Sequence, residues 1–126
     1  MDTLQADGLC LRAIDWREQD KLITLYITGK GKITATAKGC KAPKAKLKFA
    51  ASPLCFGQYE LGCKGGRYVL TGCQCHDNFF SLTSDLEKYY CAMSALEILD
   101  RTANEGEYQN NLFVRTLELL NDLCYG

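Results

Sequence analysis

The sequence predicts a small β sandwich or barrel that is followed by an α-helical segment. Apolar residues alternate along strand-like stretches in the first 76 residues, whereas from about residue 84 they recur at helical spacing. The charges divide at nearly the same place. Residues 1–76 hold 12 Lys and Arg against 6 Asp and Glu, and residues 77–126 hold 3 against 9. We therefore expect a basic β domain at 1–76 and the start of a helical domain at 77–126.

Length and composition are those of an ordinary globular protein. The chain has 126 residues, of which 47% are hydrophobic and 24% charged, which is enough to bury a core. No run approaches the roughly 20 apolar residues of a membrane span. The first 11 residues contain two acidic and no basic side chains, unlike a signal peptide. We expect neither a membrane protein nor a secreted one.

Five strands account for the β domain. Each of two hairpins has a glycine-containing turn, at 29–31 and at 64–66, flanked by segments that alternate between apolar and polar residues. The alternation leaves one face of each segment apolar, so one face is expected to be buried. The predicted strands span 8–16, 21–28, 32–38, 54–63 and 67–75.

Two helices are predicted after the strands. Residues 84–87, Ser-Asp-Leu-Glu, match a capping box, and the apolar stripe that follows continues to about residue 101. After a break at 104–107, a second apolar stripe predicts a helix at 108–125. Two such helices present more apolar surface than one pair can hide. We therefore expect the chain to stop within a helical domain and to associate with a second copy through it.

The chain has eight cysteines, which is a high count for 126 residues. Because no export signal is found and a normal core is predicted, we expect reduced thiols in a cytoplasmic protein rather than a disulfide scaffold. An alternative is a zinc site formed by Cys63, Cys73, Cys75 and His76, but their spacing departs from the paired C-x₂₋₄-C ligands of structural zinc sites. We expect no metal and no cofactor.

Nothing in the sequence indicates catalysis. There is one histidine, and no nucleophile elbow, phosphate-binding loop or His-Glu-x-x-His motif is present. The acidic residues Asp15, Glu18 and Asp20 lie near a predicted strand end, where carboxylates commonly cap turns. We expect the protein not to be an enzyme.

The lysines form the strongest signal for function. Between Asp20 and Glu60 there are eight lysines and no acidic residue, a pattern that favours contact with the phosphates of a nucleic acid. Tyrosines at 26, 59 and 68 offer faces for base stacking, although packing is the commoner role of a strand aromatic. The candidate nucleic-acid contacts are Lys30, Lys32, Lys38, Lys41, Lys44, Lys46, Lys48 and Arg67.

The order of several short motifs resembles the bacterial recombination mediator family RecO. The motifs are Arg-Glu-Gln-Asp-Lys at 17–21, Thr-Gly-Lys-Gly-Lys at 28–32 and Ala-Lys-Gly-Cys-Lys at 37–41. Residues 85–89 and 96–100 also look like the first long helix of that family. The resemblance covers most of the chain.

This resemblance implies a five-stranded OB-fold barrel, then a helical domain, in a protein of the bacterial cytoplasm associated with the nucleoid. It implies binding of single- and double-stranded DNA, strand annealing, and help in loading the recombinase RecA, with RecR and the single-stranded DNA-binding protein as partners. Family members continue through more helices, and many carry a zinc-binding cysteine cluster there. Cys63, Cys73 and Cys75 lie in the predicted barrel and do not correspond to that cluster.

We therefore predict a DNA-binding recombination and repair mediator that acts without catalysis. The alternative is a non-catalytic protein-interaction module with an OB-like barrel, whose lysines only keep the barrel soluble. A small metal-binding protein that uses the Cys and His residues is a third hypothesis. Salt dependence of DNA binding separates the first two hypotheses, and metal analysis tests the third.

Overall fold

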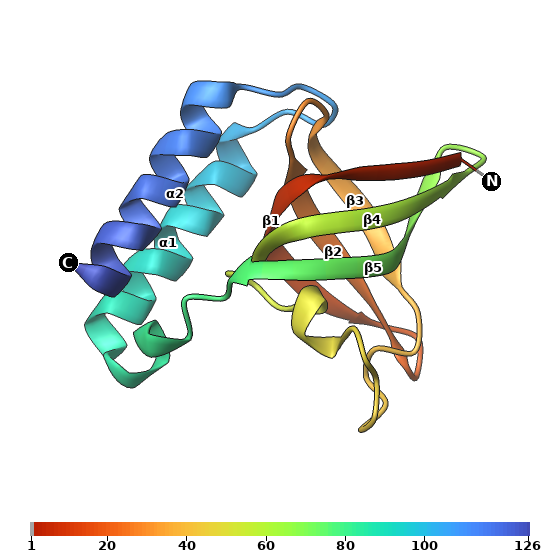
Figure 1. Ribbon diagram of the computed structural model, residues 1–126, viewed down its shortest axis with the longest axis horizontal. Helices are drawn as coiled ribbons and strands as arrows, with labels where there is room; N and C mark the ends of the chain where they lie inside the picture. Colours follow the sequence, from red (N-terminus) through yellow and green to blue (C-terminus); the bar gives the residue numbers. More distant parts are fainter. Residues whose placement is uncertain (1) are drawn as a thin grey trace.

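Five strands close into a barrel, and two helices pack against one end of it (Figure 1). The computed structural model describes residues 2–126. Its strands are β1 (Asp2–Trp16), β2 (Asp20–Ile27), β3 (Gly31–Ala37), β4 (Phe56–Lys64) and β5 (Arg67–Asp77). Its helices are the short 3₁₀ helices η1 (Lys48–Ala51) and η2 (Phe80–Ser84) and the α-helices α1 (Leu86–Thr102) and α2 (Asn110–Tyr125).

The strand order around the barrel is β1-β2-β3-β5-β4, with β4 pairing back to β1. All neighbours are antiparallel except β3 and β5, which pair in parallel at only two positions, Ala35 with Tyr68 and Thr36 with Val69. A five-stranded Greek-key barrel of this kind is the OB-fold. The predicted fold class, a β barrel followed by helices, is confirmed.

Strand β1 is the main difference from the predicted strands. It begins at Asp2 rather than at residue 8, and its first half pairs with β4 from Asp2 opposite Cys63 to Leu9 opposite Phe56. Its second half pairs with β2, and a register shift between Cys10 and Arg12 interrupts that ladder. A bulge of this kind bends a strand, which lets one strand serve two neighbours in a closed barrel.

The barrel encloses its own core. The inward side chains of β2 and β3, predicted from their alternation, are buried as expected, and the small residues Ala35 and Ala37 are 1% exposed. Tyr59 of β4 is fully buried, and its hydroxyl donates to the Ala50 carbonyl at 2.8 Å. That bond holds η1 against the end of the barrel and satisfies a hydroxyl that would be costly to bury alone.

A second core lies between the barrel and the helices. Tyr26 points out of the barrel but is fully buried, because α1 and α2 cover it, and its hydroxyl accepts from the Gln109 backbone N–H at 2.8 Å. Phe113 stacks on its ring with the centroids 5.7 Å apart. Tyr26 and Tyr59 therefore have the packing role that is common for strand aromatics and are not available for base stacking.

The start of α1 differs by one residue from the capping box that the sequence predicts. The cap is Asp85, whose carboxylate accepts from the Lys88 N–H at 3.2 Å. Ser84 instead belongs to η2 and donates to the Ser81 carbonyl at 2.8 Å. Ser and Asp are comparable N-caps, so the neighbouring 3₁₀ helix decides between them.

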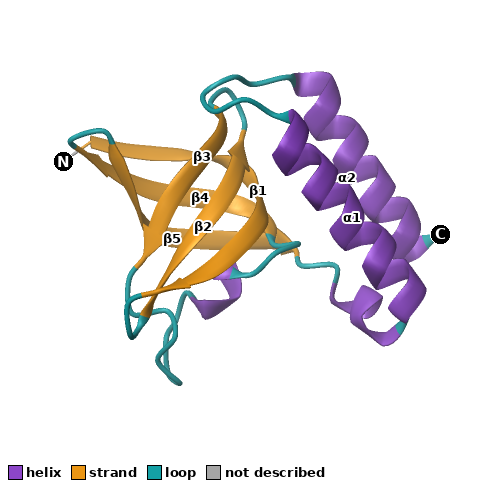
Figure 2. Ribbon diagram, turned by 180° about the vertical axis from the view of Figure 1, so that it is seen from behind, coloured by secondary structure: helices purple, strands orange, loops and turns teal. Residues whose placement is uncertain are grey.

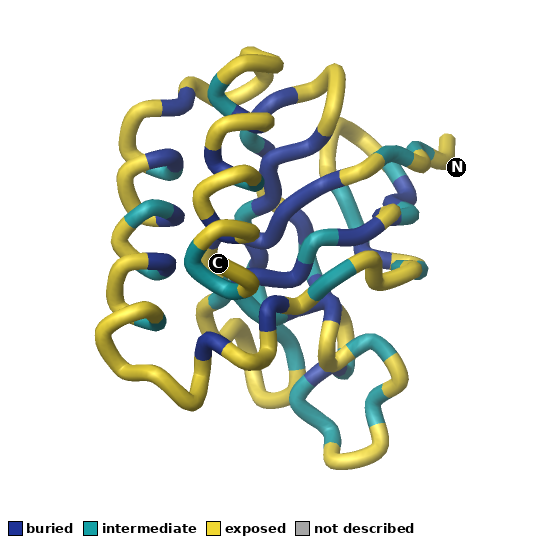
Figure 3. The backbone as a smooth tube through the Cα atoms, turned by 60° about the vertical axis from the view of Figure 1, so that its left-hand side comes forward, coloured by how far each residue is buried: buried dark blue, intermediate teal, exposed yellow. Residues whose placement is uncertain are grey.

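The helices bury only part of their apolar surface. Ala92, Leu96 and Leu99 face the barrel, and Figure 3 shows α1 dark blue on that side and yellow on the outside. Leu86 and Tyr90, which belong to the apolar stripe of this helix, are 67% and 63% exposed. The two helices lie side by side on one end of the barrel, as the view from behind also shows (Figure 2). No helix in the described range 2–126 has the length and apolar content needed to cross a membrane.

Candidate nucleic-acid interface

The predicted phosphate contacts fall at two ends of β3. This strand has seven residues, so its ends are about 20 Å apart at roughly 3.3 Å per residue. Lys30 and Lys32 lie at its start, and Lys38 and the lysines that follow lie beyond its end. The continuous basic segment of the sequence is therefore two separate places on the molecule.

The start of β3 is where the helices attach. The Lys32 Nζ donates to the Asp100 carbonyl at 2.7 Å and lies 3.4 Å from the Asp100 carboxylate. The Lys32 carbonyl accepts from the Gly106 N–H at 3.0 Å. A β-carbon at Gly31 would collide with the backbone of Glu107, so only glycine allows the loop between α1 and α2 to approach this closely. Lys32 ties the barrel to α1 and has its ammonium directed at the helix.

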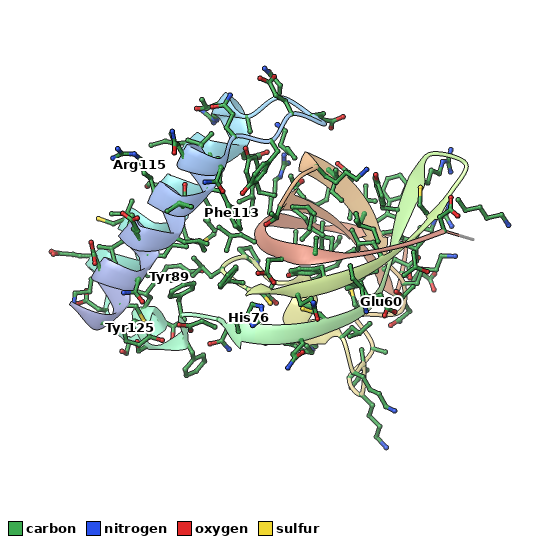
Figure 4. The ribbon with its side chains drawn as sticks, turned by 45° about the horizontal axis from the view of Figure 1, so that its top comes forward. Glu60, His76, Tyr89, Phe113, Arg115 and Tyr125 are labelled. Carbon is green, nitrogen blue, oxygen red and sulfur yellow. The ribbon has the colours of Figure 1, made fainter. Side chains whose placement is uncertain are left out.

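The end of β3 leads into residues 38–48, which we call the basic loop. Two hydrogen bonds attach it to the start of β2 and to the turn that precedes it. The Gly39 N–H donates to the Asp20 carboxylate at 2.8 Å, and the Lys41 N–H donates to the Gln19 carbonyl at 3.0 Å. Cys40 is buried and anchors the loop in the barrel core. These contacts fold the backbone of the loop while long nitrogen-ended side chains extend from it (Figure 4).

Most ammonium groups of the basic loop have no counter-charge. Lys41, which is partly buried, lies 3.4 Å from the exposed Asp15 carboxylate, and such surface pairs are weak. The lysines at 38, 44, 46 and 48 are exposed and form no ion pair with any residue in the described range. Their positive charge is therefore open to a partner from solution.

A groove of about 500 Å³ lies beside the basic loop. We call it the Trp16 groove, because Trp16 and Tyr68 are its aromatic residues. Lys38 from the start of the basic loop and Arg67 from the start of β5 also line it. Lys38 and Arg67, which are far apart in the sequence, thus line the same groove.

Two residues of the groove were not among the sequence-based candidates. Trp16 is 43% exposed, and the Arg17 guanidinium carbon lies 6.0 Å from the centroid of its ring, a cation–π distance. The sequence did contain a signal for this pair. An aromatic residue ends a predicted strand, and the basic residue after it is the first of the Arg-Glu-Gln-Asp-Lys motif. Pattern alone could not show that the β1–β2 turn faces β5.

The alternative zinc site does not assemble in the structure. Cys63 lies opposite Tyr68 in the β4–β5 ladder, whereas Cys73 lies opposite Tyr59, so the register separates Cys63 from the other three residues. His76, labelled in Figure 4, has its Nε2 atom 2.9 Å from the Asp7 carboxylate instead. Among residues 2–126, no three His, Cys, Asp or Glu side chains are placed to hold a metal ion. The register therefore keeps Cys63 away from Cys73, Cys75 and His76, which the alternative hypothesis brings together.

Cys73 approaches Cys55, which the sequence did not single out. A hydrogen bond between these thiols favours the thiolate of Cys55 and lowers its pKa to about 6, and it raises the pKa of Cys73. Burial raises the pKa of Cys10 to about 12. All eight cysteines are free thiols.

Comparison with known proteins agrees with this architecture. Residues 1–79 match the family model described as "Recombination protein O N terminal". A curated protein of Clostridium perfringens named "DNA repair protein RecO" is 36% identical over 124 residues, which cover 96% of this chain and 50% of that protein. Proteins with the same name from Pelotomaculum thermopropionicum and Syntrophomonas wolfei are 33% and 29% identical, with 100% and 95% of this chain covered, and 49% and 48% of those proteins. The chain spans about half the length of these curated relatives, and it belongs to the RecO family.

Proposed function

We propose that this chain binds DNA through the basic loop and acts in DNA repair by binding rather than by catalysis. The observation that carries the proposal is the set of exposed, uncompensated lysines on the basic loop, in a chain whose formal net charge is zero. Their charge is local and not a general excess. The name shared by the relatives, DNA repair protein RecO, supports DNA as the partner.

Charge distribution supports this side of the molecule as the binding face. Lysine ammonium groups on flexible stems neutralise phosphates and release condensed counterions, so binding is independent of sequence and sensitive to salt. The helical part holds 3 basic against 9 acidic residues, counted over 77–126. Its negative charge repels a phosphate backbone and orients the barrel toward DNA.

The wider activities implied by the family resemblance extend the proposal. A basic surface that binds two strands lowers the phosphate repulsion between them, which favours annealing. Loading of RecA, with RecR and the single-stranded DNA-binding protein as partners, belongs to the same proposal. An annealing assay with complementary oligonucleotides checks the first activity, and pull-down with each purified partner checks the others. Annealing at the uncatalysed rate would contradict the extension.

The test of DNA binding is a salt titration of affinity. Lys38→Ala, Lys44→Ala and Lys46→Ala together remove three charges from the basic loop, and the plot of log affinity against log salt should become less steep. The expected change on duplex DNA is about 0.9 per lost phosphate contact.

A matched control removes the same charge elsewhere. Lys88, Arg101 and Arg115 are exposed on α1 and α2 and lie outside the basic loop and the Trp16 groove, so their combined change to alanine should leave the slope nearly unchanged. Equal slopes for the wild type and the basic-loop variant, with both folded, would overturn the proposal. An equal loss of DNA affinity in the basic-loop variant and the control variant would show that binding depends only on the net charge of the protein.

A second role, contact with another protein, is favoured by the outer surface of the helices. Ile98 and Leu119 are 65% and 45% exposed and line a shallow groove of about 210 Å³ between α1 and α2. We propose a second copy of the chain as the occupant, with Ile98→Lys and Leu119→Lys as the variants. Leu120 is fully buried, so its substitution would test folding instead. Sedimentation that shows only monomer at high concentration would contradict this role.

A further inference from the structure

The Trp16 groove exists because two strands of the barrel barely meet. Strands β3 and β5 share only two paired positions, and the β1–β2 turn projects next to the place where they separate. The groove runs over the outward side chains Leu22, Thr34 and Thr36. Its volume of about 500 Å³ lies within the range of about 300–1,000 Å³ in which proteins bind small organic groups.

Trp16 lies outside the core of the protein. It is the sole tryptophan of the chain, it ends β1, and 43% of its surface is exposed. It belongs to neither of the two buried clusters. Exposing so large an aromatic surface is unfavourable in a free protein, which makes it available for stacking. Tyr68 of β5, partly buried, lines the same groove.

The charged groups around the ring favour an anion. Arg17 lies against Trp16, and its backbone φ of 60° is in the left-handed region that non-glycine residues rarely adopt. Lys38 and Arg67 line the groove with it. Asp20 is its one carboxylate, and this group accepts the Gly39 N–H. A planar aromatic face with cations beside it matches a nucleobase and its phosphates.

We propose that the Trp16 groove binds unpaired bases of single-stranded DNA by stacking on Trp16, and that this contact sets a preference for single strands over duplex. Bases in a duplex are stacked on each other and present no free face to the ring. The basic loop contacts phosphates, which both forms of DNA carry. The inference rests on the proposed DNA binding and divides it between two surfaces: charge from the loop and strand selectivity from the groove.

The fluorescence of Trp16 gives a direct readout. Because the chain has one tryptophan, its emission reports this site alone. Binding of a single-stranded oligonucleotide should change the emission, because a base lies on the ring. A duplex of the same length, and an abasic strand with the same number of phosphates, should bind with much smaller changes.

Substitution of Trp16 tests how much stacking contributes to the affinity for single-stranded DNA. Trp16→Ala should lower affinity for the single-stranded oligonucleotide by about 5- to 150-fold, the range for loss of one stacked base. Affinity for duplex and the salt slope should stay as in the wild type. Trp16→Phe keeps an aromatic face and should retain most of the affinity, which separates stacking from a change in the β1–β2 turn. Thermal unfolding of each variant verifies the fold.

The outcomes separate this inference from the proposed function. If folded Trp16→Ala keeps the wild-type affinity for single strands, the proposal for the groove is wrong. If the salt slope still depends on the basic loop, the proposal that the loop binds DNA is retained. If Trp16→Ala lowers affinity for single strand and duplex equally, the groove is not the contact that selects single strands. Absence of binding to either form by the wild type would overturn both.

Discussion

The barrel and the helical pair of this chain differ in how completely each encloses its apolar surface. The barrel closes on itself, with β4 paired to β1, and the alternating residues of its strands fill one core. Helices α1 and α2 bury the side that faces the barrel and leave Ile98 and Leu119 exposed on the other side. The comparison indicates that the barrel offers a polar, basic surface suited to DNA, whereas the helices offer an apolar surface suited to protein.

Charge follows the same division and also joins the two parts. The lysines of the basic loop lie at the end of β3 that is away from the helices, whereas Lys32, at the other end, contacts Asp100 of α1. One strand therefore presents its two ends to different partners: its own helices at the start and solvent at the end. Lysines of one sequence segment therefore lie in two different environments, one against a helix and the other in solvent.

The largest effect is expected from a substitution in the core between the barrel and the helices. Leu96 is fully buried in the core between barrel and helices, so Leu96→Ala should lower the free energy of unfolding by about 2–5 kcal/mol. Ile98→Ala, two residues away and 65% exposed, should change it by less than about 0.5 kcal/mol. Chemical denaturation of both variants measures the difference. Equal and small losses would show that the helices are not part of one cooperative unit with the barrel.

A smaller effect is expected at the ionic contact. The Lys32 side chain is 18% exposed and bonds to Asp100, so Lys32→Met should cost about 1–2 kcal/mol of unfolding free energy. Lys30→Met removes an exposed lysine two residues earlier and should cost nothing measurable. DNA affinity should be alike in the two variants if Lys32 serves the helix. A large affinity loss in Lys32→Met alone would return this lysine to the interface.

The smallest effect concerns reaction rates of thiols and leaves stability untouched. Cys91 on α1 and Cys75 on β5 are exposed, whereas Cys10 and Cys40 are buried in the barrel. Of the two exposed thiols, Cys91 should be alkylated before Cys75 at about pH 8, because desolvation raises the pKa of Cys75 and thiolate is the reactive form. Cys10, with its pKa raised to about 12, should react only on unfolding. Mass spectrometry identifies which cysteines are modified. Rapid modification of Cys10 in the folded protein would contradict a closed barrel.

Local pattern was sufficient for most of the fold. The alternation over 21–38 predicts a hairpin because both strands bury one face, and the structure has β2 and β3 there. The first half of β1 escaped prediction because residues such as Asp2 and Gln5 are polar and take strand form through pairing with β4. Tyr26 alternates with the core residues of β2 yet is buried, since periodicity indicates a face but not which element covers it.

The candidate site was predictable only in part, because it depends on register and closure. A count of charges locates the lysines of the basic loop. It does not separate Lys32 from Lys38, which lie about 20 Å apart along β3 at roughly 3.3 Å per residue. It also does not bring Trp16 and Arg67 together, since these residues share a groove only when β5 closes beside β3.

The central claim is that DNA contacts the barrel at the basic loop and the Trp16 groove and leaves the helices free. The most direct measurement is NMR mapping of backbone amides during titration with a single-stranded oligonucleotide. We expect the changes to concentrate in residues 16–20, the basic loop and residues 66–69, with α1 and α2 unaffected. Changes centred on α1 and α2, with the basic loop unaffected, would contradict the account.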